Sequence, residues 1–331
     1  MAFFEKSLYT AICSGNLTGV EKFIKHGLSV NYVFTDSEIL GKTLLEVAVT
    51  SGQCSIVKFL VKLKCDPNLK MVANVENYNV KLEPYKKQNR LKLSCLYPCI
   101  VKADVDMIRL LVQGGLDVNI YDDRGCTPLW HAVDLDNYQM VKTLVTSPAC
   151  DVNICDVTNL FPLHVAALHS NVKIASLLVQ KGARIDVLTV RGSTPLTLAC
   201  RSNSYETARL LLLNGANPTH RGTNGHTPVS AVLESCPDRK ILEMLIEAGA
   251  CIDKADIEKC MKEKIQLLSS DPAVLEILKV LAHTPRSLKM QSCLAIRKYI
   301  IAARSTLHIV DKVQQLRLPN CMKEFLLLNH L

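Results

Sequence analysis

A segment of 33 residues recurs along this chain, and this period constrains the fold more than any other feature. Its clearest copy spans residues 192–199 and 208–218. Thr194 has a side-chain oxygen that can cap a helix, and Pro195 suits the first helical position, where its missing N–H costs nothing. The Leu-rich second part predicts another helix, which Gly215 ends in the left-handed conformation. One such helix pair cannot bury its own apolar face, so it needs copies of itself on both sides.

Copies of this segment occur in phase over most of the chain. The apolar residue after the Thr-Pro position recurs as Leu129, Leu163, Leu196 and Val229, at intervals of 34, 33 and 33 residues. Segments similar to the one that ends the second helix recur at residues 115–119, 149–153, 182–186, 215–218 and 249–253. Thr-Pro-Leu opening one helix and Gly-Ala closing the next, at this period, resembles the ankyrin repeat family. This resemblance implies an all-α solenoid of about seven ankyrin repeats over residues 1–253, closed by degenerate capping helices over 254–284.

One insertion breaks the period between the second and third repeats. The interval from Ala48 to the equivalent Cys99 is 51 residues, and the extra residues lie at 69–93. This stretch has six Lys or Arg against two Glu, which predicts a basic loop. Insertions in repeat proteins often lie on the binding face. The alternative is a solvent-exposed loop that binds no partner, and the sequence does not distinguish a binding loop from such a loop.

Composition excludes several classes of protein. The chain has 331 residues with 48% hydrophobic content, but no stretch is long enough to span a membrane and the N-terminus has no signal peptide. We therefore expect it in the cytoplasm, with the nucleus as an alternative compartment. The 14 Cys lack the spacing of zinc sites, and thiols such as Cys65, Cys200 and Cys251 occupy core positions, so we expect them to be reduced. The net charge of +8 is concentrated at 69–93 and 285–331, which argues against nucleic-acid binding along the repeats.

The last part of the chain no longer follows the period. Thr284 and Pro285 predict the start of a helix in which Leu288, Ser292 and Ile296 share one face. This tail resembles a SOCS box, a small module of three helices that would occupy residues 285–331. The residues that match the module are Ser287, Leu288, Ile296 and Arg297 in its elongin-binding helix, and Leu316, Leu318, Pro319, Lys323, Phe325, Leu326 and Leu327 after it.

Two residues depart from the SOCS-box pattern. The Cys of the elongin-binding helix is replaced by Ser292, and the neighbouring Cys293 lies about 100° round the helix. Burying the hydroxyl of Ser292 costs about 1–2 kcal/mol, which weakens elongin binding without forbidding it. Arg317 stands where the family has the first Pro of its cullin-binding segment, so this departure bears on the choice of cullin more than on the binding of elongin.

The whole layout resembles the ankyrin repeat and SOCS box family, whose members are substrate receptors of elongin B/C–cullin-5 ubiquitin ligases. By this resemblance, Leu288, Ser292 and Ile296 would bind elongin C, and Leu316, Leu318 and Pro319 would bind cullin-5, which carries a RING-box protein. The repeats would hold a target protein, which the sequence does not identify. A protein-interaction scaffold or inhibitor that recruits no ligase is the alternative.

The surface that would bind the target is expected at the loop tips and at the exposed ends of the first helices. The candidate residues there are Tyr121, Asp122, Arg124, Trp130, His169, Arg191, Arg201 and Arg221. Trp130 could be a binding anchor or could pack against the adjacent repeat. His164 and His169 are five residues apart, so they do not share a helix face as metal ligands would, and His164 is expected to bond backbone groups of the adjoining turn. We therefore expect no catalytic residue, metal or cofactor.

Overall fold

The computed structural model describes residues 2–36, 41–69, 95–223, 225–235, 238–250 and Lys323. It divides into two compact units, with the boundary between Val157 and Thr158. The described residues are helical apart from turns, loops and one isolated bridge between Val33 and Thr43. In the part of the chain that the structure describes, no helix is both long and apolar enough to cross a membrane.

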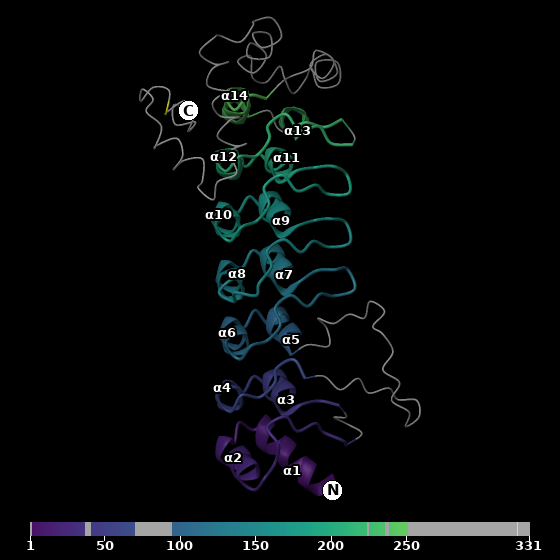
Figure 1. The fold of residues 1–331 in the computed structure, drawn as a ribbon, viewed down its shortest axis with the longest axis vertical. Coiled ribbons are helices and arrows are strands. Elements are labelled where there is room, and N and C mark those ends of the chain that lie inside the picture. Colours follow the sequence, from purple (N-terminus) through teal and green to yellow (C-terminus); the bar gives the residue numbers. More distant parts are fainter. Residues whose placement is uncertain are drawn as a thin grey trace, which may run out of the picture. The chain divides into compact units, whose positions relative to one another are not determined.

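The first unit is a stack of antiparallel helix pairs, with the odd-numbered helices in one layer and the even-numbered helices in the other (Figure 1). Its described helices are α1 (Ala2–Cys13), α2 (Leu17–Lys25), α3 (Leu44–Thr50), α4 (Cys54–Lys62), α5 (Leu96–Val101), α6 (Val105–Gln113), α7 (Pro128–Asp134) and α8 (Tyr138–Leu144).

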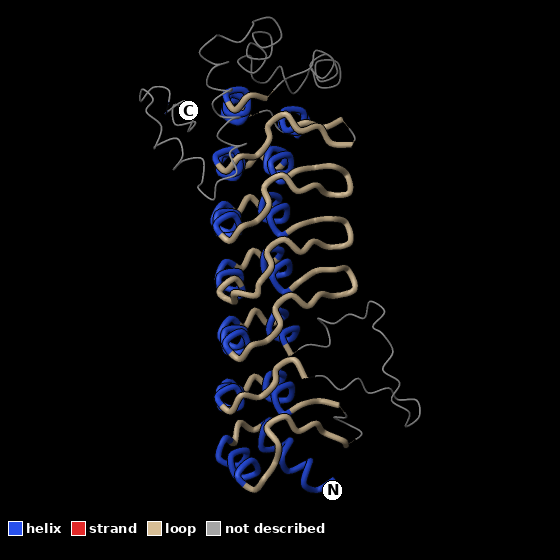
Figure 2. Tube along the Cα trace, in the orientation of Figure 1, coloured by secondary structure: helices blue, strands red, loops and turns tan. Residues whose placement is uncertain are grey.

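The second unit has the same two-layer arrangement, and Figure 2 shows its loops projecting on the side of the odd-numbered helices. Its described helices are α9 (Pro162–Leu168), α10 (Val172–Gln180), α11 (Pro195–Arg201), α12 (Tyr205–Leu213), α13 (Pro228–Ser235) and α14 (Arg239–Glu247). The predicted all-α repeat architecture is thus confirmed. The proposed basic loop lies almost entirely outside the described residues, and so do the capping helices at 254–284.

The short first helices begin where the sequence predicts. Thr194 adopts an extended conformation and its hydroxyl accepts the backbone N–H of Thr197, with Pro195 at the first helical position. Thr43 caps α3 in the same way, and the Glu46 carboxylate accepts the backbone N–H of Thr43, which completes a capping box. Gly215, directly after the C-cap of α12, has φ +97°, a left-handed value that favours Gly.

The core lies between adjacent helix pairs, as the repeat pattern predicts. Leu129, Leu163, Leu196 and Val229 are all at most 2% exposed. Burying a side chain of this size stabilises the fold by about 1.5–3 kcal/mol. The core thiols follow the same pattern: Cys200 is fully buried, and burial raises the pKa of Cys65 to about 11, which keeps it protonated. Cys251 lies outside the described residues.

Asn side chains connect successive repeats of the first unit at the turns after the second helices. Asn68 donates its amide to the Gly115 carbonyl at 3.0 Å and accepts the Asp117 N–H at 2.7 Å. Asn119 makes the same pair of bonds to Ala149 and Asp151, at 2.6 and 2.9 Å. Each Asn thus satisfies one carbonyl and one N–H of the following repeat, which fixes the register of stacking.

The N-terminal helix carries a buried carboxylate. Helix α1 begins at Ala2 and includes Glu5. Glu5 is buried and accepts bonds from the hydroxyls of Tyr32 and Thr35 and from the N–H groups of Thr35 and Asp36. Burial alone would raise its pKa, but these bonds outweigh burial and lower the pKa from 4.5 to about 2.

We predict that Glu5→Gln weakens the attachment of the first loop to α1 by about 2 kcal/mol, because hydrogen bonds to a charged acceptor are the strong ones. The folded-state pKa is depressed, so the stabilisation is fully present above pH 4.5 and is lost as the pH falls towards about 2. Amide hydrogen exchange at Thr35 and Asp36 measures this directly. The difference in exchange protection between wild type and Glu5→Gln should narrow as the pH falls through that window. The control Glu206→Gln, at an exposed position of α12, should leave the protection unchanged. A difference in protection that does not depend on pH would contradict the prediction.

Candidate functional site

In the described part of the chain, hairpin-like loops precede α7, α9, α11 and α13, and these loops hold most of the predicted binding residues. The loop before α7 is closed by a bond from the Asp122 N–H to the Cys126 carbonyl at 3.0 Å and by one from the Gly125 N–H to the Asp122 carbonyl, also 3.0 Å. In the second unit, the equivalent closing bond joins the Thr189 N–H to the Ser193 carbonyl at 3.0 Å. The loops are therefore well-defined turns, which can present side chains in fixed positions.

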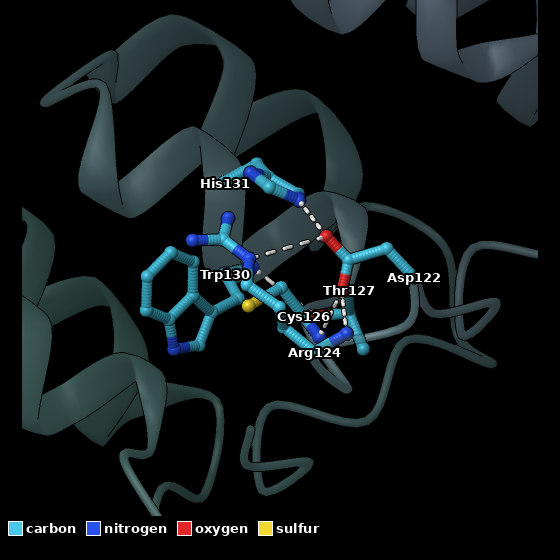
Figure 3. A network of polar contacts seen from close by, with 6 residues as sticks. All are labelled: Asp122, Arg124, Cys126, Thr127, Trp130 and His131. Atoms are coloured by element: carbon cyan, nitrogen blue, oxygen red, sulfur yellow. Dashed lines mark hydrogen bonds and ion pairs between the residues drawn. The ribbon is translucent and has the colours of Figure 1, made fainter. Parts of the chain in front are cut away.

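Asp122 organises the loop before α7 from the inside (Figure 3). Its side chain is only 6% exposed, and one carboxylate oxygen accepts the N–H groups of Arg124 at 3.0 Å and Cys126 at 2.8 Å. The other oxygen lies 3.1 Å from Nε2 of His131, on α7, and 3.9 Å from the Arg124 guanidinium. Asp122 was predicted to be part of the target-binding surface, but the structure places it beneath that surface as its support.

Asp122, Cys126 and His131 also bring potential metal-ligand atoms within 4.8 Å of one another. Both oxygens of Asp122 already accept hydrogen bonds from the chain. Burial, with the nearby charge of Asp122, raises the pKa of the Cys126 thiol to about 12, whereas a metal requires the thiolate. The contacts of this cluster are therefore those of a loop support.

Trp130 occupies a position that other repeats use for capping. At the equivalent positions, Glu46, His164 and Ser230 each accept the backbone N–H of their N-cap residue. An indole has no acceptor, so Trp130 cannot do this. Its ring is 7% exposed, with the Arg124 guanidinium 5.9 Å from the ring centroid, a cation–π arrangement that Figure 3 shows.

This arrangement determines what the loop before α7 offers to a partner. The Arg124 side chain is exposed and covers the indole, and Tyr121 is exposed at the start of the same loop. Of the two interpretations of Trp130, packing into the repeat is the one observed in this structure. A partner at this loop would therefore meet the exposed guanidinium before the largely buried indole.

His164 has the structural role that the sequence predicts. It is fully buried on α9; its Nδ1 accepts the Phe161 N–H at 3.1 Å, and its Nε2 lies 3.1 Å from the Ser193 carbonyl. The acceptor at Nε2 and the donor at Nδ1 together require the neutral form protonated on Nε2. His164 thus links the start of α9 to the loop of the next repeat.

The remaining predicted target-binding residues lie in the second unit and all are exposed. His169 follows α9, Arg201 is the last residue of α11, and Arg191 and Arg221 lie in the two following loops. The elongin- and cullin-binding candidates lie outside the described residues: Leu288, Ser292, Ile296, Leu316, Leu318 and Pro319. Sequence reasoning missed Glu5 because its contacts are to residues about 30 positions away, and it missed His131 because no regular spacing signals its contact with Asp122.

Comparison with known families identifies two modules. A family described as "Ankyrin repeats (3 copies)" matches residues 75–156, 146–222 and 163–256, which together span more than half of the chain. A family described as "SOCS box" matches residues 284–327. The structure adds α1 to α4, two helix pairs that precede the first ankyrin match.

Curated relatives match this chain over part of its length. The nuclear factor NF-kappa-B p105 subunit of Gallus gallus is 24% identical over 181 residues, which is 54% of this chain and 16% of that protein. The alpha-latrocrustotoxin-Lt1a of Latrodectus tredecimguttatus is 29% identical over 181 residues, 54% of this chain and 12% of the toxin. The I-Kappa-B like protein C2 of Microplitis demolitor bracovirus is 33% identical over 100 residues, 29% of this chain and 55% of that protein. The chain thus matches less than a fifth of the first two relatives and about half of the third.

We predict that Asp122→Ala destabilises the first unit by about 2 kcal/mol, because it leaves the Arg124 and Cys126 N–H groups without their acceptor. The chain has one Trp, so the fluorescence of Trp130 during urea unfolding reports on this site alone. Asp123→Ala, one residue along on an exposed position, is the matched control and should change stability by less than about 0.5 kcal/mol. Equal effects of the two substitutions would show that Asp122 does not support the loop.

Proposed function

The chain belongs to the ankyrin repeat and SOCS box family, and we propose that it is the substrate-recognition subunit of a ubiquitin ligase formed with elongin B, elongin C, cullin-5 and a RING-box protein. The observation that carries this proposal is the order of modules in one chain. Ankyrin repeats mediate protein interactions, and here they are followed by a SOCS box at residues 284–327. We assign residues 1–253 to the repeats, 254–284 to capping helices and 285–331 to the SOCS box.

Elongin C binding is assigned to the first predicted helix of the SOCS box. Leu288, Ser292 and Ile296 recur every four residues, so a helix would present them as one strip. Leu288 would fill an apolar pocket on elongin C, where burying a Leu side chain contributes about 1.5–3 kcal/mol. Ser292 would lie in the same contact, at the position where the family has the small side chain of Cys.

Cullin-5 binding is assigned to the segment that follows. Leu316, Leu318 and Pro319 all lie within the SOCS-box match. A Leu-x-Leu-Pro run favours an extended conformation, since the residue before a Pro avoids the helical region. Arg317 replaces the family's Pro, which removes some rigidity from this segment and leaves its apolar residues in place.

The repeats would hold the target close to the ubiquitin-loaded enzyme that the RING-box protein recruits. Proximity raises the effective concentration of target lysines, and this is the whole catalytic contribution that the proposal requires of the chain. The residues proposed to bind the target are those predicted from the sequence, with Asp122 as the support of its loop. We place this activity in the cytoplasm.

We predict that the intact chain co-purifies with co-expressed elongins B and C, and that Leu288→Ala reduces elongin binding about tenfold or more, because it removes the central apolar contact. Leu318→Ala is the matched control: it deletes the same atoms from the cullin segment, so it should retain the elongins while losing cullin-5. Failure of the intact chain to bind elongins would overturn the proposal and favour a scaffold without ligase recruitment.

A second substitution tests the role of Ser292. We predict that Ser292→Cys tightens elongin C binding about threefold to tenfold, because a thiol is less costly to bury than a hydroxyl. Cys293→Ser makes the reverse change one position along, about 100° round the helix, and should leave the affinity unchanged. Isothermal titration with purified elongin B/C measures both. An unchanged or weaker complex with Ser292→Cys would show that this residue does not face elongin.

A further inference from the structure

One face of the second unit has an unusual charge composition. We define the inner face as the loops and first helices of this unit, residues 158–170, 187–203 and 219–235. Its full charges are Arg191, Arg201, Arg221 and the single acidic residue Glu234. Glu234 lies 3.0 Å from Nδ1 of His226, on the same face. The inner face therefore has an excess of positive charge, all of it from Arg.

The rest of the second unit does not share this bias. The described second helices and their following turns carry six Lys or Arg against five Asp or Glu. Lys and Arg are equally common there, whereas the inner face has Arg alone. Arg offers a planar fork of donors that matches a carboxylate, and it contacts apolar and aromatic surfaces more readily than Lys does.

Bonds between successive repeats order the backbone near Arg191 and Arg201. At the loop tips, the Val190 N–H donates to the Thr158 carbonyl at 3.0 Å, and the Thr223 hydroxyl donates to the Arg191 carbonyl at 2.8 Å. At the helix ends, the Ser202 hydroxyl donates to the Leu168 carbonyl at 3.0 Å. The backbone at Arg191 is thus bonded to the repeats on both sides, and the residue after Arg201 is bonded to the preceding repeat.

Ion pairing among the described residues does not explain the Arg191 and Arg201 side chains, and only Arg201 lies at a helix end. Both are exposed, and among the described residues neither forms an ion pair. Arg201 lies at the C-terminus of α11, where a cation is favourable for the helix dipole, but Arg191 lies in a loop and has no such role. Large apolar side chains lie exposed beside them, with Val190 64% and Leu188 43% exposed and Leu168 partly exposed.

We infer that the inner face of the second unit binds an extended acidic segment of the target, in which Asp or Glu stands at every third position with aliphatic residues between. Carboxylates of the segment pair with Arg191, Arg201 and Arg221, and its aliphatic side chains cover Leu168, Leu188 and Val190. Adjacent repeats are separated by about 10 Å, which an extended chain in the polyproline II conformation spans in about three residues. Because this conformation has about three residues per turn, acidic residues at every third position lie on one side of the segment and would meet each repeat in turn. This inference rests on the proposed function, since it names the class of target that the receptor would take.

The test uses the full-length chain and a fluorescein-labelled peptide of twelve residues, with Glu at every third position and Leu and Val between. A second peptide has Gln in place of Glu. In fluorescence anisotropy at low salt, the acidic peptide should bind at least about tenfold more tightly than the Gln peptide, and raising the salt to about 0.3 M should remove most of the difference. Replacing Leu and Val of the acidic peptide by Ser should weaken binding about threefold or more. Equal binding of the Glu and Gln peptides would overturn the inference.

Matched double variants locate the site. Arg191→Glu with Arg201→Glu should reduce affinity for the acidic peptide about tenfold or more, because like charges then face each other. Lys173→Glu with Lys181→Glu makes the same change in net charge at exposed positions on and just after α10, and should stay within about twofold of wild type. Equal losses in the two double variants would show attraction to net charge alone and would overturn the inference. A single-stranded oligonucleotide of equal charge that competes as well as the peptide would do the same.

The elongin assay separates this inference from the function on which it rests. Arg191→Glu with Arg201→Glu should retain elongins B and C, because the substitutions are far in sequence from the SOCS box. A chain that binds elongins and shows no preference for the acidic peptide would refute the inference and leave the receptor function standing. A chain that binds the peptide and not the elongins would refute the receptor function alone.

Discussion

Burial of apolar surface between neighbouring helix pairs is the interaction on which each unit depends. Leu163 and Leu196 are almost completely buried because the next pair covers them, and no single pair could cover its own face. Stability in such a stack is close to a sum of contacts between nearest neighbours. The outward-facing residues therefore contribute little to folding, and they can differ from repeat to repeat without loss of the fold. This property suits a protein whose exposed side chains are chosen for a partner.

Polar side chains order the loops of the stack, which no β-sheet supports. Asp122 accepts the N–H of Cys126 at 2.8 Å, and Thr189 accepts the N–H of Ser193 at 3.1 Å at the equivalent place in another repeat. Glu5 does similar work for the first loop from the preceding helix. Buried polar groups are costly unless their bonds are complete, and the buried carboxylates of Asp122 and Glu5 each accept two backbone N–H groups. The loops that would meet a target are consequently rigid, which lowers the entropy cost of binding.

The proposed activity requires two separate surfaces on one chain. One holds a target through exposed residues such as Arg191 and Arg201, and the other attaches to the ligase through Leu288 and its neighbours. Neither surface needs a nucleophile or a metal, because the chemistry belongs to the enzymes that the complex brings together. The Asp122–His131 cluster shows why geometry must be checked before a site is assigned. Its ligand-like residues are already occupied in supporting the loop.

Sequence alone determined the repeat period, the helix starts at residues such as Thr194, the left-handed end at Gly215 and the buried bonding of His164. These features follow from short-range chemistry or from a strict period, and both can be read along the chain. Tertiary structure alone decided that Asp122 lies beneath its loop, that Arg124 covers Trp130 and that α1 begins at Ala2 to place Glu5 against a loop about 30 residues away. The burial of one polar side chain depends on which distant backbone groups reach it, and no local pattern carries that information.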